Sequence, residues 1–184
     1  MTLSLLTSTS LVAAVLLGLS ALFIWSPDFW RQWLRTFPRS EPWSWLTMGG
    51  AGLWFLARIW ALGPEDWLFG PNTRIIMLLV FGVTWVGSFV YVKDFLAVRG
   101  LCALVLLSAT ELLSSAWGLY EIPSRLWLVS FIYVVIVIAI WVGMSPFRMR
   151  DFVEWLDKKG CRARLVGSIL GAYGVLLAVI AATF

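Results

Sequence analysis

Long uninterrupted runs of apolar residues make up most of the chain, and short polar segments separate them. Each run is close to the roughly 20 residues that a helix needs to cross the hydrocarbon core of a bilayer. Because the runs are continuously apolar and do not alternate, they predict helices and not barrel strands. The runs are Leu3–Trp25, Trp43–Leu62, Ile75–Val92, Gly100–Tyr120, Leu126–Met144 and Leu165–Phe184. They predict an all-α polytopic transmembrane bundle of about six spans, forming one membrane domain over residues 1–184.

Composition narrows the class of protein further. Hydrophobic residues make up 61% of the chain and charged residues 13%, whereas a soluble domain carries about 25% charged residues. This excludes a soluble globular domain and a disordered chain. The sequence has no histidine, which excludes His-ligated haem, zinc or chlorophyll and any catalytic triad that uses histidine. The cofactor stays unknown, and nucleic acid is not expected among the partners.

Cationic residues predict the orientation in the membrane. The first, third and fifth connecting segments hold 11 of the 14 Lys and Arg residues, and Arg58, Arg74 and Arg125 lie toward the other face. The positive-inside rule therefore places these three segments in the cytoplasm and both termini outside, as in a bacterial cytoplasmic (inner) membrane. Met1–Ser10 has no positive charge, so the first run is interpreted as a retained span and not a signal peptide. Cys102 and Cys161 fall near the cytoplasmic side and are expected to stay reduced.

The first and fifth connecting segments resemble each other. Residues 26–37 and 145–156 both start with Ser-Pro and both carry apolar residues at i, i+3, i+4 and i+7. This spacing predicts two short amphipathic interfacial helices, started by Ser26-Pro27 and Ser145-Pro146 and ended near Pro38 and Gly160. In the spans that follow, Gly49 and Gly52 align with Gly171 and Gly174. We interpret the pattern as a parallel internal repeat, with repeat A at about 3–62, a central hairpin at about 75–120 and repeat B at about 126–184.

The second copy carries a likeness to a known family. Its motif consists of Pro146, an amphipathic helix, Arg164, and the spaced glycines Gly167, Gly171 and Gly174. With these residues the outer hairpins resemble a small two-helix bacterial inner-membrane protein family of unknown function. The first copy lacks the equivalent arginine. The resemblance implies a fold and brings no activity with it.

The two amphipathic helices present basic residues beside an apolar face. Such helices can lie among anionic lipid headgroups, but we favour the simpler interpretation that they cover the bundle end and anchor the flanking spans. The acids Asp151, Glu154 and Asp157 alternate with cations, which indicates an ion-paired surface and not a catalytic cluster. The interfacial basic residues are Arg31, Arg35, Arg148, Arg150, Lys158 and Lys159.

Glu111 stands out because it lies near the middle of the fourth apolar run. Placing a charged carboxyl there costs on the order of 2.5–3.5 kcal/mol, so such residues usually face the protein interior or water. Ser108, Ser114 and Ser115 share its side of the helix and could hydrogen-bond across the bundle. The group is a candidate ion or proton site, and a structural hydrogen bond between helices is the equal alternative. Arg58 could pair with Glu111 only if the bundle brings the two spans together.

The aromatic residues are mostly placed at the ends of spans. Of 13 tryptophans, only Trp54 and Trp85 fall near span centres, and the others predict belts at the two membrane–water interfaces. Trp54 and Trp85 are therefore candidate ligand-lining aromatics, for a sugar or a quinone.

These features favour a non-enzymatic assembly or accessory subunit of a membrane complex. The small size, the missing soluble domain and the lack of convergent polar residues motivate this hypothesis. The expected partners are the lipid bilayer and other membrane protein subunits, or a second copy of the chain. The alternative is a small ion- or proton-coupled carrier or channel that uses Glu111. A lipid-modifying enzyme is the least favoured hypothesis.

Overall fold

The computed structural model describes residues 4–25, 28–63, 66 and 70–183. Within these ranges the chain is all-helical and contains no strand, which confirms the all-α class. The elements are α1 (Leu5–Trp25), α2 (Asp28–Thr36), η1 (Phe37–Arg39), α3 (Glu41–Trp60), η3 (Gly70–Asn72), α4 (Thr73–Tyr91), α5 (Leu96–Ala116), α6 (Arg125–Met144), α7 (Phe147–Asp157) and α8 (Gly160–Ala181).

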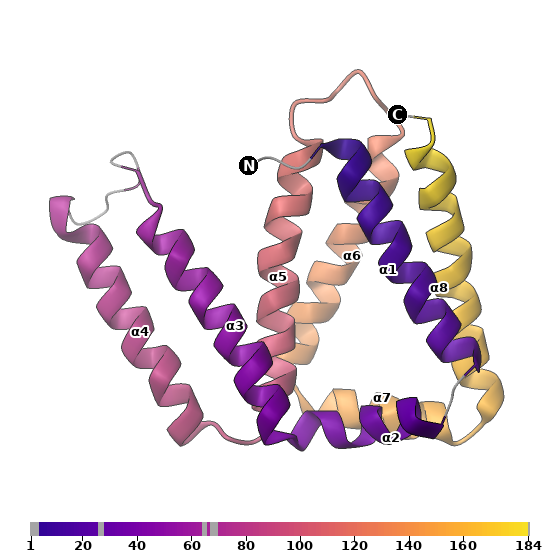
Figure 1. Ribbon diagram of the computed structural model, residues 1–184, viewed down its shortest axis with the longest axis horizontal. Coiled ribbons are helices and arrows are strands. Elements are labelled where there is room, and N and C mark those ends of the chain that lie inside the picture. Colours follow the sequence, from indigo (N-terminus) through magenta and orange to yellow (C-terminus); the bar gives the residue numbers. More distant parts are fainter. Residues whose placement is uncertain (1–3, 26–27, 64–65, 67–69, 184) are drawn as a thin grey trace.

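The long helices run between two ends of the molecule, and the short helices α2 and α7 lie across one of them (Figure 1). We call this the α2–α7 end; α1 begins and α8 finishes at the opposite end. Five helices are long and apolar enough to cross a membrane, namely α1, α4, α5, α6 and α8. α3 has 20 residues, but its tryptophans, its glycines and Arg58 lower its hydropathy, so length and composition alone do not establish it as a sixth span.

Three of the predicted span boundaries are wrong by about one turn. α5 runs from Leu96 to Ala116 and not from Gly100 to Tyr120, and α8 starts at Gly160 and not at Leu165. The cause at α5 is local: Phe95 takes a left-handed backbone conformation with φ of 57°, and the helix starts directly after it. Arg99 therefore lies in the first turn of α5 and not in a loop, and its Nε atom is buried without a hydrogen-bond partner among the described residues.

The short helices confirm the predicted amphipathic segments. α2 ends at Thr36 and α7 at Asp157, shortly before Pro38 and Gly160. α7 begins at Phe147, and Pro146 is the N-cap residue directly before it. The predicted start signal at residues 26–27 lies outside the described residues.

α1 and α8 form the most extensive helix pair, and glycines make the close approach possible. A Cβ atom at Gly167 would lie 2.8 Å from Cγ1 of Ile24, and one at Gly174 would lie 3.1 Å from Cβ of Leu16. Gly171 faces Ser20 in the same seam. Because lipid tails are as apolar as leucine, spans associate through such close packing and not through hydrophobic burial. These three glycines of α8 therefore allow α1 and α8 to approach closely.

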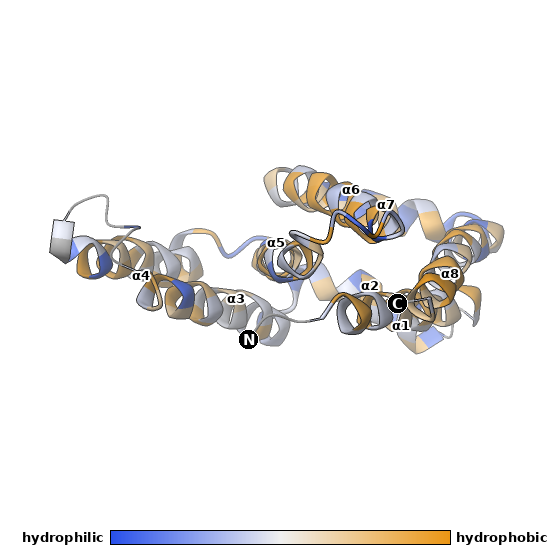
Figure 2. Cartoon of the chain, turned by 90° about the horizontal axis from the view of Figure 1, so that it is seen from above, coloured by the Kyte–Doolittle hydropathy of each residue, from blue (hydrophilic) through white to orange (hydrophobic). Residues whose placement is uncertain are grey.

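α5 stands at the centre of the remaining helices and contacts both α3 and α6. Its Gly100 is buried against the backbone of Thr47 and Met48 on α3, and the Thr47 hydroxyl donates a 3.0 Å hydrogen bond to the Ala97 carbonyl. α4 lies at the edge of the molecule, next to α3 (Figure 2). Only 6% of the apolar segment of α4 is buried, against 33% for α5.

The order long helix, short helix, long helix occurs twice, as α1–α2–α3 and as α6–α7–α8. The packing of the two units differs, because α8 pairs with α1 whereas α3 packs mainly against α5. The glycines also differ: Gly171 faces α1, but a Cβ at Gly49 would meet nothing within 4 Å. The internal repeat stays a prediction.

Candidate functional site

Glu111 is paired with Arg58, so the fold does bring the two helices α3 and α5 together at this point. Oε1 of Glu111 on α5 lies 2.8 Å from Nη1 of Arg58 on α3. α5 ends at Ala116, four residues before the predicted Tyr120, so Glu111 lies five residues from the helix end, and Arg58 is two residues from the end of α3. The pair therefore lies toward the end of the bundle opposite α2 and α7, where it ties α3 to α5. A carboxylate that already has a cationic partner supports the structural interpretation of Glu111.

The serines predicted to accompany Glu111 do not reach across the bundle. The hydroxyls of Ser108, Ser114 and Ser115 donate to the carbonyls of Leu104, Thr110 and Leu112, all within α5. Serine in an apolar helix often satisfies its hydroxyl in this way, because the preceding turn offers a carbonyl. The three serines and Glu111 thus do not form a convergent polar site.

Trp85 and Trp54 differ in their surroundings. Nε1 of Trp85 on α4 donates a 2.9 Å hydrogen bond to the Met48 carbonyl on α3. Gly52 makes room for this ring, since a Cβ there would lie 2.1 Å from Nε1. Trp85 also lines a lateral cleft, whereas Trp54 is not among the residues lining it. Of the two candidate aromatics, Trp85 is therefore the one that lines this cleft.

This cleft, which we call the α3–α4–α5 cleft, has a volume of about 450 Å³ and lies between the three helices that name it. Its walls are apolar except for a few hydroxyls, and two of these, on Thr84 and Ser88, are already bonded to carbonyls of α4. The lining residues are Met48, Ala51, Gly52, Phe55, Leu56, Phe81, Thr84, Trp85, Ser88, Ala103, Leu106, Leu107 and Thr110. The lining residues include no carboxyl, amino, guanidinium, imidazole or thiol group that could act as an acid or a base.

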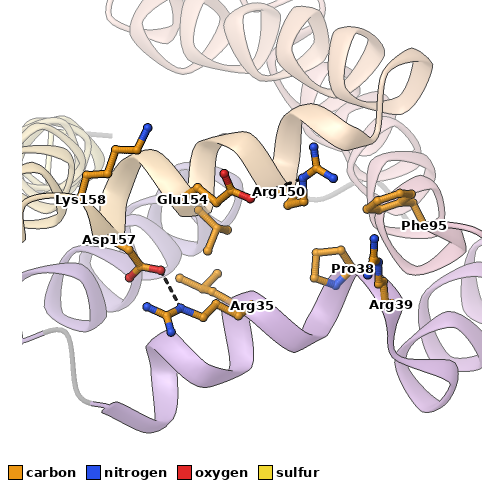
Figure 3. A pocket seen from close by; sticks show the side chains of 10 residues that line it. Arg35, Pro38, Arg39, Phe95, Arg150, Glu154, Asp157 and Lys158 are labelled. Carbon is orange, nitrogen blue, oxygen red and sulfur yellow. Dashed lines mark hydrogen bonds and ion pairs between the residues drawn. The ribbon is translucent and has the colours of Figure 1, made fainter.

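A second hollow, the α2–α7 groove, lies between the two short helices and has a volume of about 550 Å³ (Figure 3). Arg35 on α2 and Asp157 on α7 join its walls, with Nε 2.7 Å from Oδ2. This hydrogen bond, and then the charge of Asp157, raises the pKa of Arg35. The groove is lined by Leu34, Arg35, Pro38, Arg39, Phe95, Arg150, Val153, Glu154, Asp157 and Lys158.

The three acids of α7 are occupied by arginines. Arg150 lies 3.2 Å from Asp151 and 3.6 Å from Glu154, and Asp157 is bound to Arg35. This confirms the ion-paired surface that the alternation of charges predicts. Among the described residues, no group of three or more His, Cys, Asp or Glu side chains could hold a metal ion.

The predicted interfacial basic residues divide into two groups. Arg35, Arg150 and Lys158 line the α2–α7 groove. The others, which do not line it, are Arg31, Arg148 and Lys159; Arg148 stacks over the Trp141 ring at 4.2 Å. Sequence reasoning missed Arg39 and Phe95 as lining residues, because each follows a different helix and only the tertiary packing brings them together.

An aromatic cluster fixes α2 to the bundle. Trp30 and Trp33 stack with their ring centres 4.9 Å apart, and Trp33 meets Trp43 of α3 edge to face at 5.3 Å. Leu34 on the same face is buried against Val153 of α7. The apolar face of α2 is therefore covered by protein, which supports the predicted role of the short helices as a cover and anchor.

No protein-family model, no curated protein and no solved structure matches the chain. The likeness of the outer hairpins to the two-helix family stays an interpretation of the residues that carry it.

Proposed function

We propose that the protein is a non-enzymatic integral membrane protein that acts as an assembly or accessory subunit of a larger membrane complex. The observation that carries this proposal is the α3–α4–α5 cleft, together with the few contacts that hold α4. The cleft is apolar and about 450 Å³ in volume. α4 packs against α3, and the rest of its surface is almost entirely exposed, since only 6% of its apolar segment is buried.

The cleft fits a transmembrane helix of a partner subunit. Its walls come from the middle parts of three long helices, so a segment seated there would lie at the depth of the hydrocarbon core. Van der Waals packing drives association at that depth, and a helix in the cleft would pack against α4 and α5 at once. The hydroxyl groups of Thr84 and Ser88 on its walls already donate hydrogen bonds to carbonyls of α4. Because these groups need no further partner, the cleft favours an apolar occupant.

A photoreactive amino acid in the cleft tests this proposal. We expect cross-linking from Thr84, which lines the cleft and is exposed, and none from Val137, which lies 65% exposed on α6 away from it. The product should match, in mass and sequence, a membrane protein that co-purifies with the chain in nanodiscs at a fixed ratio. Cross-links only to lipid, or a monomer without a co-purifying protein, would contradict the proposal. A product of two copies of the chain would also contradict it, since the partner would then be the chain itself.

The proposal includes six spans in a bacterial cytoplasmic membrane, with both termini outside and α3 as the sixth span. α3 runs beside α5 between the same two ends of the bundle (Figure 1), which supports this count. The 11 Lys and Arg residues in the three segments of the α2–α7 end support the orientation. The repeated order of elements supports an origin by fusion of two hairpin units.

The two free cysteines offer a test of the orientation. Cys161 is exposed in the first turn of α8, at the α2–α7 end, whereas Cys102 is buried in α5. A membrane-impermeant maleimide should therefore label the native protein in inside-out vesicles and leave it unlabelled in spheroplasts. The C161S variant should stay unlabelled in both preparations. Labelling in spheroplasts would reverse the proposed orientation.

A further inference from the structure

The α2–α7 groove carries more positive than negative charge. Four cations line it, namely Arg35, Arg39, Arg150 and Lys158, together with two acids, Glu154 and Asp157. Both acids already have a cationic partner, Arg150 for Glu154 and Arg35 for Asp157. Asp151, next to the groove, is held by Arg150 as well. The lining groups therefore sum to a net charge of about +2 that the lining acids do not neutralise.

Arg39 is the lining arginine that forms no ion pair with an acid of the described residues. Its guanidinium lies over the Phe95 ring, 5.7 Å from the ring centre, and among the described residues it has no acidic partner. In Figure 3 it stands at the end of the groove beside Pro38, opposite α7. A planar guanidinium held against an aromatic ring is well suited to bind a phosphate with two hydrogen bonds. Lys158 lies at the other end of the groove and has no partner within the described part of the chain either.

The groove also has an apolar side. Leu34 and Val153 are buried in its floor, and Pro38 and Phe95 form one end. The two short helices lie across the ends of the long helices (Figure 1), at the depth where lipid headgroups meet water. A ligand that matches both sides must carry a negative charge and an apolar part, which is the chemistry of an anionic phospholipid.

From this geometry we infer that the α2–α7 groove binds the phosphate-bearing headgroup of an anionic phospholipid, with Arg39 as the main phosphate contact and Lys158 adding charge at the rim. Arg35 is held by Asp157, and Arg150 by Glu154 and Asp151, so these two arginines position the walls. The site goes beyond the proposed subunit role, because it is separate from the α3–α4–α5 cleft and needs no partner protein.

Native mass spectrometry of the full chain, released from nanodiscs of mixed phosphatidylglycerol and phosphatidylcholine, tests this inference. The wild type should retain phosphatidylglycerol in preference to phosphatidylcholine. A direct contact between a cation and the lipid phosphate is expected to change binding by about fivefold, so R39Q and K158Q should each lower phosphatidylglycerol retention by about fivefold. The R39K variant, which keeps the charge, should retain most of it.

R164Q is the matched control, because Arg164 is exposed on α8, is not a lining residue and loses the same charge. Its retention should stay close to the wild-type value, and all variants should keep the wild-type helical content. Equal losses in R39Q, K158Q and R164Q would overturn the inference, since they would indicate only diffuse attraction to the anionic surface. Displacement of the lipid by inorganic phosphate at equal concentration would overturn it too, because the site would then select a free phosphate.

Discussion

Replacing Gly100 with alanine should lower the free energy of unfolding by about 2–4 kcal/mol, the largest effect expected for a single methyl group in this protein. A Cβ at this position would lie 2.3 Å from the Met48 nitrogen and 2.7 Å from the Thr47 carbonyl carbon. These are backbone atoms, so α3 itself would have to move away. The movement would also stretch the hydrogen bond from the Thr47 hydroxyl to the Ala97 carbonyl, at present 3.0 Å long.

The measurement is the midpoint of thermal or SDS-induced unfolding in a mild detergent, followed by circular dichroism. Gly50 provides the control, because it lies on the exposed side of α3 and a Cβ there would meet nothing within 4 Å. The G50A variant should be neutral or more stable by up to about 1 kcal/mol, since alanine favours a helix over glycine. Equal behaviour of G100A and G50A would show that α3 and α5 do not pack as closely as described.

The second large effect is expected at the Arg58–Glu111 pair. The E111Q variant should lose about 1–3 kcal/mol of stability, because it leaves the Arg58 guanidinium without a counter-charge close to the hydrocarbon core. Arg58 is 56% and Glu111 30% exposed on the side chain, which places the expected cost below that of a fully buried pair. The swapped double variant R58E/E111R should recover at least half of the loss, since the attraction is restored with the charges exchanged.

The control is E121Q, which removes a carboxylate from the exposed segment after α5, where the structure gives it no ionic partner. Unfolding in detergent measures stability, and ion flux in reconstituted vesicles measures transport. If E111Q were as stable as E121Q, the pair would not tie the two helices together. Loss of flux with unchanged stability would instead support the alternative of a carrier that uses Glu111.

The long helices were predictable because a bilayer span needs about 20 apolar residues and each such run is visible in one dimension. The short helices were predictable for a similar reason, since the spacing of Trp30, Trp33 and Leu34 marks one helix face. The start of α5 was not predictable, because a cation such as Arg99 usually marks a loop, and the sequence does not show that the helix starts directly after the left-handed backbone at Phe95. Because α5 is shifted by one turn toward the N-terminus, Glu111 lies closer to the end of its helix than the sequence predicts.

The sequence alone could not identify which side chains contact each other across the bundle. Arg58 on α3 and Glu111 on α5 are separated in the sequence by α4, and no periodicity relates them. The ring of Trp85 fits against α3 only because Gly52 has no side chain there. A glycine in an apolar run does not indicate which neighbouring side chain will pack against it. The α2–α7 groove likewise depends on Arg39 and Phe95, which the fold brings together from the ends of two connecting segments.

The α1–α8 pair has a consequence for the order in which the protein is made. α1 ends at Trp25 and its partner α8 begins at Gly160, with every other described helix between them. At a synthesis rate of about 5–20 residues per second, α1 waits roughly 7–27 s in the membrane before α8 leaves the ribosome. During that time the side of α1 that carries Ser20 and Leu16 contacts lipid or an insertion factor and not the glycines of α8. The most extensive helix contact of the bundle is therefore the last to form, so a chain interrupted before Gly160 lacks the contact between α1 and α8.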